Sequence, residues 1–350
     1  MVTVEQCCEI LDSMRIPVTA SERECGEYPY YGANGIQGYV SNYIFDDELV
    51  LVAEDGGNFG SKEKPIAYRV SGKCWVNNHA HVLKPKEGLD VEYLCYSLMF
   101  YRVEGMINGA TRKKLTQKAL RQMKIPMLKL DEQIKIVTQI KHIEMIKEKR
   151  LKQLQKLDEL IQARFVEMFG DPIINPFNWE KKRFDSICEN LDSRRKPISS
   201  GDRVEGIYPY YGASGIVDYV EDYIFDEDIL LVSEDGANLL MRSTPIAFSV
   251  SGKVWVNNHA HVVKFDEMSL QKYVEIYFSL IDISENITGS AQPKLNQAKL
   301  NEMMIPIPEK ALLEQYCEFL KQIYKSKVEI QQALEKTQLL FDSLMQQYFG

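Results

Sequence analysis

The chain has 350 residues, enough for two or three domains, and its hydrophobic and charged fractions are typical of soluble globular proteins. Its N-terminus carries acidic residues early and lacks the apolar core of a signal peptide, and no run of about 18 apolar residues predicts a membrane span. The seven cysteines form no C-x-x-C pair, which favours reduced thiols and a cytoplasmic location. A net charge of −8 argues against a uniformly basic nucleic-acid binder, so a surface of that kind must be local.

Residues 1–130 predict a mixed, mostly β head. The segment YPYYGANGIQGYV (28–40) combines four tyrosines with three glycines and indicates a rigid turn. ELVLVA (48–53) predicts a buried strand, and IAYRVSG (66–72) and KCWVNNHAHVL (73–83) predict two more that meet at a glycine turn. VEYLCYSLMFYRV (91–103) predicts a buried helix.

Local basic clusters follow in the chain, at residues 112–124, 181–183 and 194–196. They suit either phosphate contacts or solvated charged faces, and their charge alone does not separate the two interpretations.

The whole arrangement occurs twice in the sequence, with a constant offset of 180 residues. YPYYGASGIVDYV (208–220) matches residues 28–40 at ten of thirteen positions, and SGKVWVNNHAH (251–261) matches residues 71–81 at ten of eleven. DILLVS (228–233) repeats the buried strand. A second head is therefore expected at 181–310, joined to the first repeat by a proline-containing linker at 171–180.

Each head is followed by a segment without proline or glycine, at 131–169 and 311–349, that predicts a long helix. Apolar residues recur every three or four positions and indicate a coiled-coil seam. We expect an α+β tandem duplication in which the helices of 131–170 and 311–350 pack as an antiparallel coiled coil of about 58 Å and hold the heads apart, as in a calliper. The expected seam residues are Ile136, Ile140, Ile143, Leu154, Leu157, Ile161, Leu320, Ile323, Ile330, Leu334, Phe341 and Leu344.

No convincing active site follows from the sequence. His79 and His81 share one face of a strand, but no third zinc ligand stands at a fixed spacing, so a structural role is favoured. Glu54 and Glu234 end strands and leave a metal-dependent nuclease open as an alternative. A clamp protein of the same calliper shape that binds another protein is a second alternative. We expect no metal, no cofactor and no catalysis in this chain.

The combination of motifs resembles the specificity (S) subunit of type I restriction–modification enzymes over essentially the whole chain, twice. The residues that carry the resemblance are YPYYGANGIQGYV, the Glu-Asp-Gly after a strand, SGKCWVNNHAHV, ITGSAQPKL (287–295) and LIQARFVEMFGDPIINP (160–176). The resemblance implies that 1–130 and 181–310 are target recognition domains and that 131–170 and 311–350 are spacer helices. The heads would read the two halves of a split sequence in double-stranded DNA.

The same resemblance implies partners but no chemistry of its own. Two methyltransferase (M) subunits would supply S-adenosylmethionine-dependent adenine methylation. Nuclease and translocase (R) subunits would bring ATP and Mg²⁺ dependence.

Loops that differ between the two heads are the expected readers of bases, because their Arg, Lys, Asn and Gln side chains suit base edges. They are residues 14–27, 57–64 and 110–117, with 194–207, 237–244 and 290–297 in the second head. Lys114 and Lys294 are common to both heads, so phosphate contact is expected for them. The tyrosines of the 28–40 turn could equally be core packing, with only Asn34 and Ser214 exposed. The expected DNA-binding residues are Tyr31, Asn34, Asn58, Lys62, Arg112, Lys113, Lys114, Tyr211, Ser214, Asn238, Arg242, Gln292 and Lys294.

Overall fold

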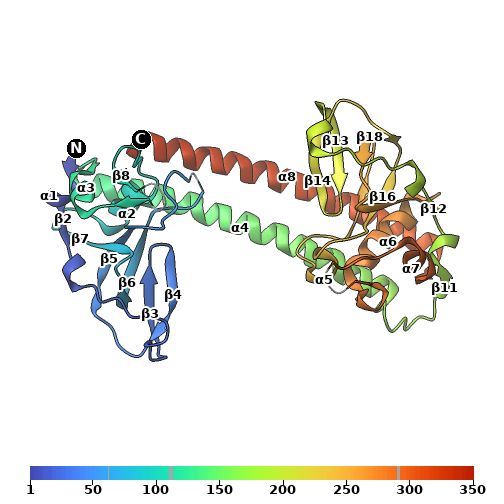
Figure 1. Ribbon diagram of the computed structural model, residues 1–350, viewed down its shortest axis with the longest axis horizontal. Helices are drawn as coiled ribbons and strands as arrows, with labels where there is room; N and C mark the ends of the chain where they lie inside the picture. The colour runs from blue at the N-terminus through green and yellow to red at the C-terminus, as the bar shows by residue number, and fades with distance from the viewer. Residues whose placement is uncertain (62, 110–112, 290–291) are drawn as a thin grey trace. The chain divides into compact units, whose positions relative to one another are not determined.

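The computed structural model describes residues 1–61, 63–109, 113–289 and 292–350 (Figure 1). The chain forms two compact units, one of residues 1–151 with 332–350 and one of residues 152–331. Each unit contains one head and a part of each long helix. Within the described residues, no helix has the length and apolar character needed to cross a membrane.

The head of the first unit is built on a six-stranded sheet with the order β2-β7-β5-β6-β3-β4. The central strand β5 is antiparallel to β6 and β7, and β3 runs parallel to β6. The strands are β1 (Val2–Thr3), β2 (Cys8–Ile10), β3 (Tyr28–Gly32), β4 (Gly35–Val40), β5 (Phe45–Ala53), β6 (Ala67–Val76), β7 (Ala80–Pro85), β8 (Ile107–Asn108), β9 (Lys114–Leu115) and β10 (Lys124–Ile125). The helices are α1 (Val4–Cys7), the 3-10 turn η1 (Asp12–Met14), α2 (Val91–Met99) and α3 (Gln117–Gln122).

Strand β5 is buried on both faces, which explains its uninterrupted apolar run. Val50 and Val52 pack on one side into the core that includes α2, and Leu49 and Leu51 pack on the other side. The predicted buried strand is therefore confirmed. Helix α2 is also confirmed but ends at Met99, several residues before the predicted end.

The head of the second unit repeats this plan in two four-stranded sheets, ordered β12-β19-β16-β17 and β14-β13-β18-β15. Its strands are β11 (Glu180–Arg183), β12 (Glu189–Asn190), β13 (Glu205–Gly212), β14 (Gly215–Val220), β15 (Phe225–Asp226), β16 (Ile229–Ser233), β17 (Ala247–Val250), β18 (Lys253–Val256), β19 (Ala260–Lys264) and β20 (Met304–Ile307). Its helices are η2 (Phe184–Ser186), η3 (Asp192–Arg194), η4 (Ser200–Asp202), α5 (Asn238–Met241), α6 (Met268–Leu280), η5 (Ser284–Asn286) and α7 (Gln297–Glu302).

The prediction of a glycine turn between residues 66–72 and 73–83 was wrong, because β6 of the first head continues through Gly72. In the second head, Gly252 does separate β17 from β18. In the first head Arg69 of β6 forms an ion pair with Glu48 of the neighbouring strand β5. Its counterpart Ser249 donates instead to Glu275 on α6.

The prediction of one continuous strand over residues 73–83 was wrong. The Asn77 side chain accepts a hydrogen bond from the backbone N–H of His79 and closes a turn, so β6 ends at Val76 and β7 begins at Ala80. The same turn forms between Asn257 and His259 in the second head.

The two long helices are α4 (Leu130–Phe169) and α8 (Lys310–Phe349), each one residue longer than predicted. Within each unit their segments are antiparallel. In the first unit, Lys147 bonds Gln338 and Arg150 bonds Ala333. Residue numbers therefore rise along one helix while they fall along the other. In the second unit, the pairs are Asp158 with Lys327 and the Ile161 carbonyl with the Tyr316 hydroxyl.

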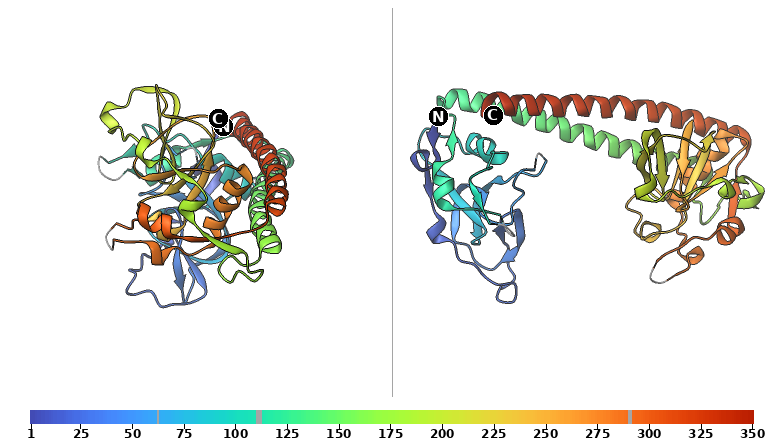
Figure 2. Two further views of the ribbon diagram at one scale, coloured as in Figure 1. Left: turned by 90° about the vertical axis from the view of Figure 1, so that its right-hand side faces the viewer. Right: turned by 45° about the horizontal axis from the view of Figure 1, so that its top comes forward.

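All twelve predicted seam residues are buried or half-buried, whereas many of their helix neighbours are exposed. Much of the seam packs into a head as well as against the other helix. Ile136, Ile140 and Phe341 belong to the core of the first head, and Ile161 and Leu320 belong to that of the second. The expectation that each helix buries its seam against the other was therefore incomplete. Within the first unit the two chain ends lie near one another (Figure 2), and Phe349 contacts the ring of Tyr93 on α2.

Phe165 is the centre of an aromatic cluster in the second unit, within 5.8 Å of the rings of Phe169, Tyr273 and Tyr316. Because this side chain is fully buried, Phe165→Ala is expected to lower the free energy of unfolding by about 3–5 kcal/mol, measured by chemical denaturation. Leu160→Ala, on an exposed turn of the same helix, is the control. Equal losses for the two variants would contradict this account of the core.

Candidate functional site

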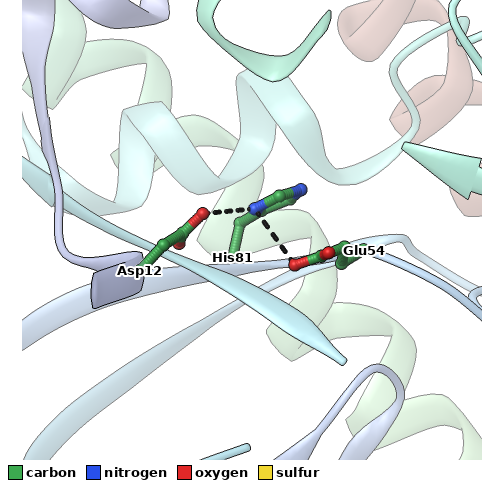
Figure 3. A group of neighbouring side chains, drawn as sticks. All are labelled: Asp12, Glu54 and His81. Atoms are coloured by element: carbon green, nitrogen blue, oxygen red, sulfur yellow. Dashed lines mark hydrogen bonds and ion pairs between the residues drawn. The ribbon is translucent and has the colours of Figure 1, made fainter. Parts of the chain in front are cut away.

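Each head contains a buried cluster of charged side chains drawn from distant parts of the sequence (Figure 3). Asp12, Glu54 and His81 have ligand-type atoms within 4.8 Å of one another, and their counterparts are Asp192, Glu234 and His261. Asp12 begins the turn η1, Glu54 follows the last residue of β5, and His81 lies on β7. The sheet thus brings three separate segments to one point.

Hydrogen bonds fix Asp12 and Glu54 in place. One carboxylate oxygen of Asp12 accepts the backbone N–H of Val82 at 2.9 Å, and the other accepts the side-chain amide of Gln117 at 2.9 Å. The backbone N–H of Glu54 donates to the His79 carbonyl, and its carbonyl accepts the N–H of Leu115 at 2.7 Å. Both acids are therefore held by several different elements of the head.

Two further cations complete the cluster in the first head. Arg15 places one nitrogen 2.6 Å from Glu54 Oε2 and donates the same nitrogen to the Ala80 carbonyl at 2.7 Å. Lys114 places Nζ 2.8 Å from Glu54 Oε1. Both oxygens of the Glu54 carboxylate are thus occupied by cations.

Both ring nitrogens of His81 have an oxygen partner. Nε2 lies 2.8 Å from the Leu115 carbonyl, which can only accept, so this nitrogen carries a proton. Nδ1 lies 2.7 Å from Asp12 Oδ2. The ring is fully buried between these two partners.

The carboxyl groups of the cluster have lowered pKa values. Burial, the largest influence, would raise the pKa of Asp12, but the hydrogen bond and charge of His81, with Val82 and Gln117, lower it below its usual value. Burial likewise opposes the net shift at Glu54, where Lys114, Arg15 and His81 lower the pKa. Asp192 and Glu234 are shifted in the same direction by their own partners.

The second head reproduces these contacts almost atom for atom. Arg195 lies 2.6 Å from Glu234, and Lys294 lies 3.0 Å from the other oxygen of the same carboxylate. His261 bonds Asp192 at 2.6 Å and the Leu295 carbonyl at 2.8 Å. One partner differs between the heads. Asn190 contacts Asp192 at 3.3 Å in the second head, whereas Gln117 contacts Asp12 in the first.

The cluster has the atom types of a metal site but not an open coordination shell. Arg15 and Lys114 occupy the oxygens of Glu54, and Asp12 and Leu115 occupy the nitrogens of His81. A divalent cation would have to displace these partners and would meet two fixed positive side chains. Among the described residues, the site is therefore an ion-pair network, which gives the nuclease alternative no support.

The network stands at the roots of the three loops that differ between the heads. Arg15 begins the loop of residues 14–27, and Glu54 lies just before the loop of residues 57–64. Lys114 pairs with Asn108 in the hairpin of β8 and β9. In the second head, Thr288 and Lys294 exchange both backbone hydrogen bonds at 2.8 Å and close the matching hairpin. One buried cluster therefore fixes the base of every predicted reading loop.

In the first head, the predicted site residues fall into three groups. Asn34 is exposed at the turn, donates to the Gly56 carbonyl and accepts from the Asn58 side chain, which links two of the loops. Lys113 is exposed beside Lys114. Lys62 and Arg112 lie outside the described residues.

Several predicted residues of the second head organise their own loop. Asn238 bonds Ser243 and both backbone groups of Thr244. Arg242 donates to the carbonyls of Phe278 and Ile281 at the end of α6. Desolvation by burial lowers the pKa of Arg242. Ser214 and Gln292 are exposed.

The segment of residues 28–40 forms the paired strands β3 and β4, with a turn only between them, and the second head forms β13 and β14 in the same way. The tyrosines of β3 and β13 divide between buried and half-buried positions. Tyr30 and Tyr210 are buried and donate their hydroxyls to loop carbonyls, which fits the core-packing interpretation. Tyr31 and Tyr211 are half-buried beside the rings of Tyr68 and Phe248.

Sequence reasoning did not identify Arg15 and Arg195 as ion partners and did not connect Asp12 with His81. A signal was present: all five residues of the network recur at the offset of 180. The structural role favoured for His81 agrees with its two hydrogen bonds.

The chain belongs to the family described as the type I restriction modification DNA specificity domain, whose sequence profile matches residues 1–156 and 176–339. A candidate type I restriction enzyme specificity subunit of Haemophilus influenzae is 36% identical over 140 residues, and the match spans 40% of this chain and 36% of that protein. The MjaIX specificity subunit of Methanocaldococcus jannaschii is 22% identical over 80% of this chain and 74% of its own length.

Solved structures share the fold at low sequence identity. The S subunit of a type I system from M. genitalium has a TM-score of 0.62 at 14% identity and covers 99% of this chain and 95% of its own. A chain from a study of type I complex assembly and conformational transition has a TM-score of 0.58 at 12% identity, covering 99% and 96%. The α+β prediction is confirmed. Specificity subunits of type I systems are non-catalytic, in agreement with the expectation that this chain is not itself an enzyme.

The lowered carboxyl pKa values predict a loss of stability in acid. A carboxyl whose folded-state pKa is below its unfolded value stabilises the fold above that unfolded value, here 3.8 for Asp12 and 4.5 for Glu54. This contribution disappears as the pH falls through the folded-state pKa. The free energy of unfolding should therefore fall between about pH 5 and pH 3.

Asp12→Asn with Asp192→Asn should lower stability at neutral pH and flatten this acid dependence, as measured by denaturation at a series of pH values. Asp131→Asn, exposed on the first turn of α4, is the control. An unchanged slope in the double variant would show that the network does not carry the acid sensitivity.

Proposed function

We propose that this chain is the DNA-binding specificity subunit of a type I restriction–modification complex and reads a bipartite target in double-stranded DNA. Family membership supports this proposal. The observation that carries it is internal to the chain: two heads keep one buried network to within 0.2 Å in its ion pairs, while the loops rooted on that network differ. A shared framework with different loops suits two related readers of different sequences.

The domain assignment follows the same logic. Residues 1–130 and 181–310 are the two target recognition domains, and residues 131–170 and 311–350 are the spacer helices, with 171–180 as the linker. The predicted DNA-binding residues lie on or beside the loops and the repeated turn. Exposed side chains such as Asn34, Lys113, Ser214 and Gln292 are the first candidates for base or phosphate contacts.

The proposed partners are methyltransferase and restriction subunits, with S-adenosylmethionine, ATP and Mg²⁺ bound by those partners. Apolar residues on the outer faces of the long helices, including Leu151, Leu160, Leu339 and Leu340, are exposed and supply area for such contacts. The acidic net charge of the chain is compatible with DNA binding if the basic side chains gather at the loops.

Because the heads are so similar, the two half-sites should be related but not identical. Mapping of methylated adenines in cells that express the complex, by sequencing that detects modified bases, gives both half-sites directly. Exchange of residues 110–117 for the 290–297 sequence should convert the first half-site toward the second. Two half-sites without any common base pattern would overturn the proposed relation between the heads.

The spacer helices are proposed to set the number of unread base pairs. Insertion of one helical turn, about four residues, after Leu151 and after Gln331 should lengthen the unread spacer by about two base pairs, since each residue adds ~1.5 Å and each base pair ~3.4 Å. The same adenine mapping measures the spacer. An unchanged spacer in a complex that still methylates DNA would reject this role for the helices.

A further inference from the structure

We propose that Lys114 and Lys294 each form an anion site for a DNA backbone phosphate, with a positive charge that the buried network holds in place. This inference rests on the proposed function and adds to it a specific contact in each head. It also adds a physical reason why that contact is the same in both.

The contacts of the network show that Glu54 does not depend on the lysine alone. Arg15 lies 2.6 Å from Glu54 Oε2 and 3.6 Å from Asp12 Oδ2, so one buried cation serves both carboxylates. Lys114 contacts the other oxygen of Glu54, Oε1, at 2.8 Å. The neighbouring Asp55 carboxylate is engaged by His79 at 2.7 Å.

Exposure separates the lysine from the other members. The side chain of Lys114 is 49% exposed and that of Lys294 is 48% exposed, whereas Arg15 and Glu54 are 12% exposed. A ligand from solvent can reach the lysine without opening the buried part. The four buried side chains of the network would each leave an unpaired partner if they turned outward, which is costly.

The lysine can bind a phosphate without breaking the network. An ammonium has three N–H donors, and Glu54 Oε1 accepts one of them at 2.8 Å. If the ammonium moves toward a phosphate, Glu54 keeps Arg15 at 2.6 Å and has His81 Nδ1 at 3.6 Å. The second head offers the same arrangement, with Arg195 at 2.6 Å and His261 at 3.8 Å from Glu234.

The position of the lysine indicates a backbone contact rather than base reading. It ends a hairpin whose intervening residues differ between the heads, while the lysine and the cluster below it are the same. A side chain common to two readers of different sequences cannot carry the difference between them. Phosphate contacts fix register and orientation and carry no sequence information, which suits this residue.

The test is the salt dependence of DNA binding by the full chain assembled with its methyltransferase subunits. The probe is a labelled duplex that contains the target found by adenine mapping, compared with a duplex of unrelated sequence. Each lost phosphate contact should reduce the slope of log K against log salt by about 0.9. Lys114→Gln with Lys294→Gln should therefore reduce it by about 1.8, and should weaken both duplexes by a similar factor.

Lys84→Gln with Lys264→Gln is the matched control. These lysines also stand at the offset of 180, are 41% and 44% exposed and lie within 2.7 Å of a carboxylate, on Asp47 and Glu227. They are remote in sequence from the reading loops, and their variant should keep the parental slope. Lys114→Arg with Lys294→Arg keeps the charge and should also retain it.

An unchanged slope in the Gln variant, an equal reduction in the control pair, or a lost slope in a folded Arg variant would overturn the lysine assignment. A changed preference among target sequences in the Gln variant would also overturn it, because it would indicate base contact. If the parental complex shows no preference for the mapped target, the proposed function itself fails. A normal preference with an unaffected slope would reject only the phosphate site.

Discussion

The rest of each head depends on a buried pairing of charges. Asp12 and Glu54 are removed from water, and an isolated ionised carboxylate in such a place is strongly unfavourable. They are stable there because His81 and Arg15 bond them in fixed geometry, and the backbone N–H of Val82 satisfies a further lone pair of Asp12. Removing one member of such a group leaves an unpaired charge, which typically costs more than the pair contributes. The three segments that supply the group are therefore tied to one another.

This constraint explains how one framework can carry two sets of loops. In the first head, the loop after Glu54 is rich in glycine, with Gly56 and Gly60 at positive φ. In the second head the corresponding segment forms α5, whose own Leu239 is buried. Arg242, which follows α5, donates a hydrogen bond to a carbonyl of α6. Both loops leave from the same anchored carboxylate. The conformation of a loop can therefore change without moving its root.

The sequence predicted the duplication, the buried strands and the long helices, because these depend on patterns within short segments or on direct comparison of the repeats. The network was beyond that reasoning, since its members are separated by tens of residues and meet only when the sheet forms. Arg15 resembled an ordinary loop arginine of the type expected to read bases, yet its guanidinium bonds Glu54 and the Ala80 carbonyl. Arg242 is a similar case, engaged with the end of α6.

Substitutions at the loops and at their roots affect stability differently because the two lie in different dielectric environments. Charges inside the cluster interact strongly because little water lies between them, so any substitution there disturbs both members of a pair. Exposed side chains on the loops are solvated, and exchanging one such side chain for another usually changes stability little. Variation is therefore tolerated on the loops and penalised at their roots. The tyrosines of the repeated segment belong with the roots. The buried hydroxyls of Tyr30 and Tyr210 bond the loops that contain Arg15 and Arg195.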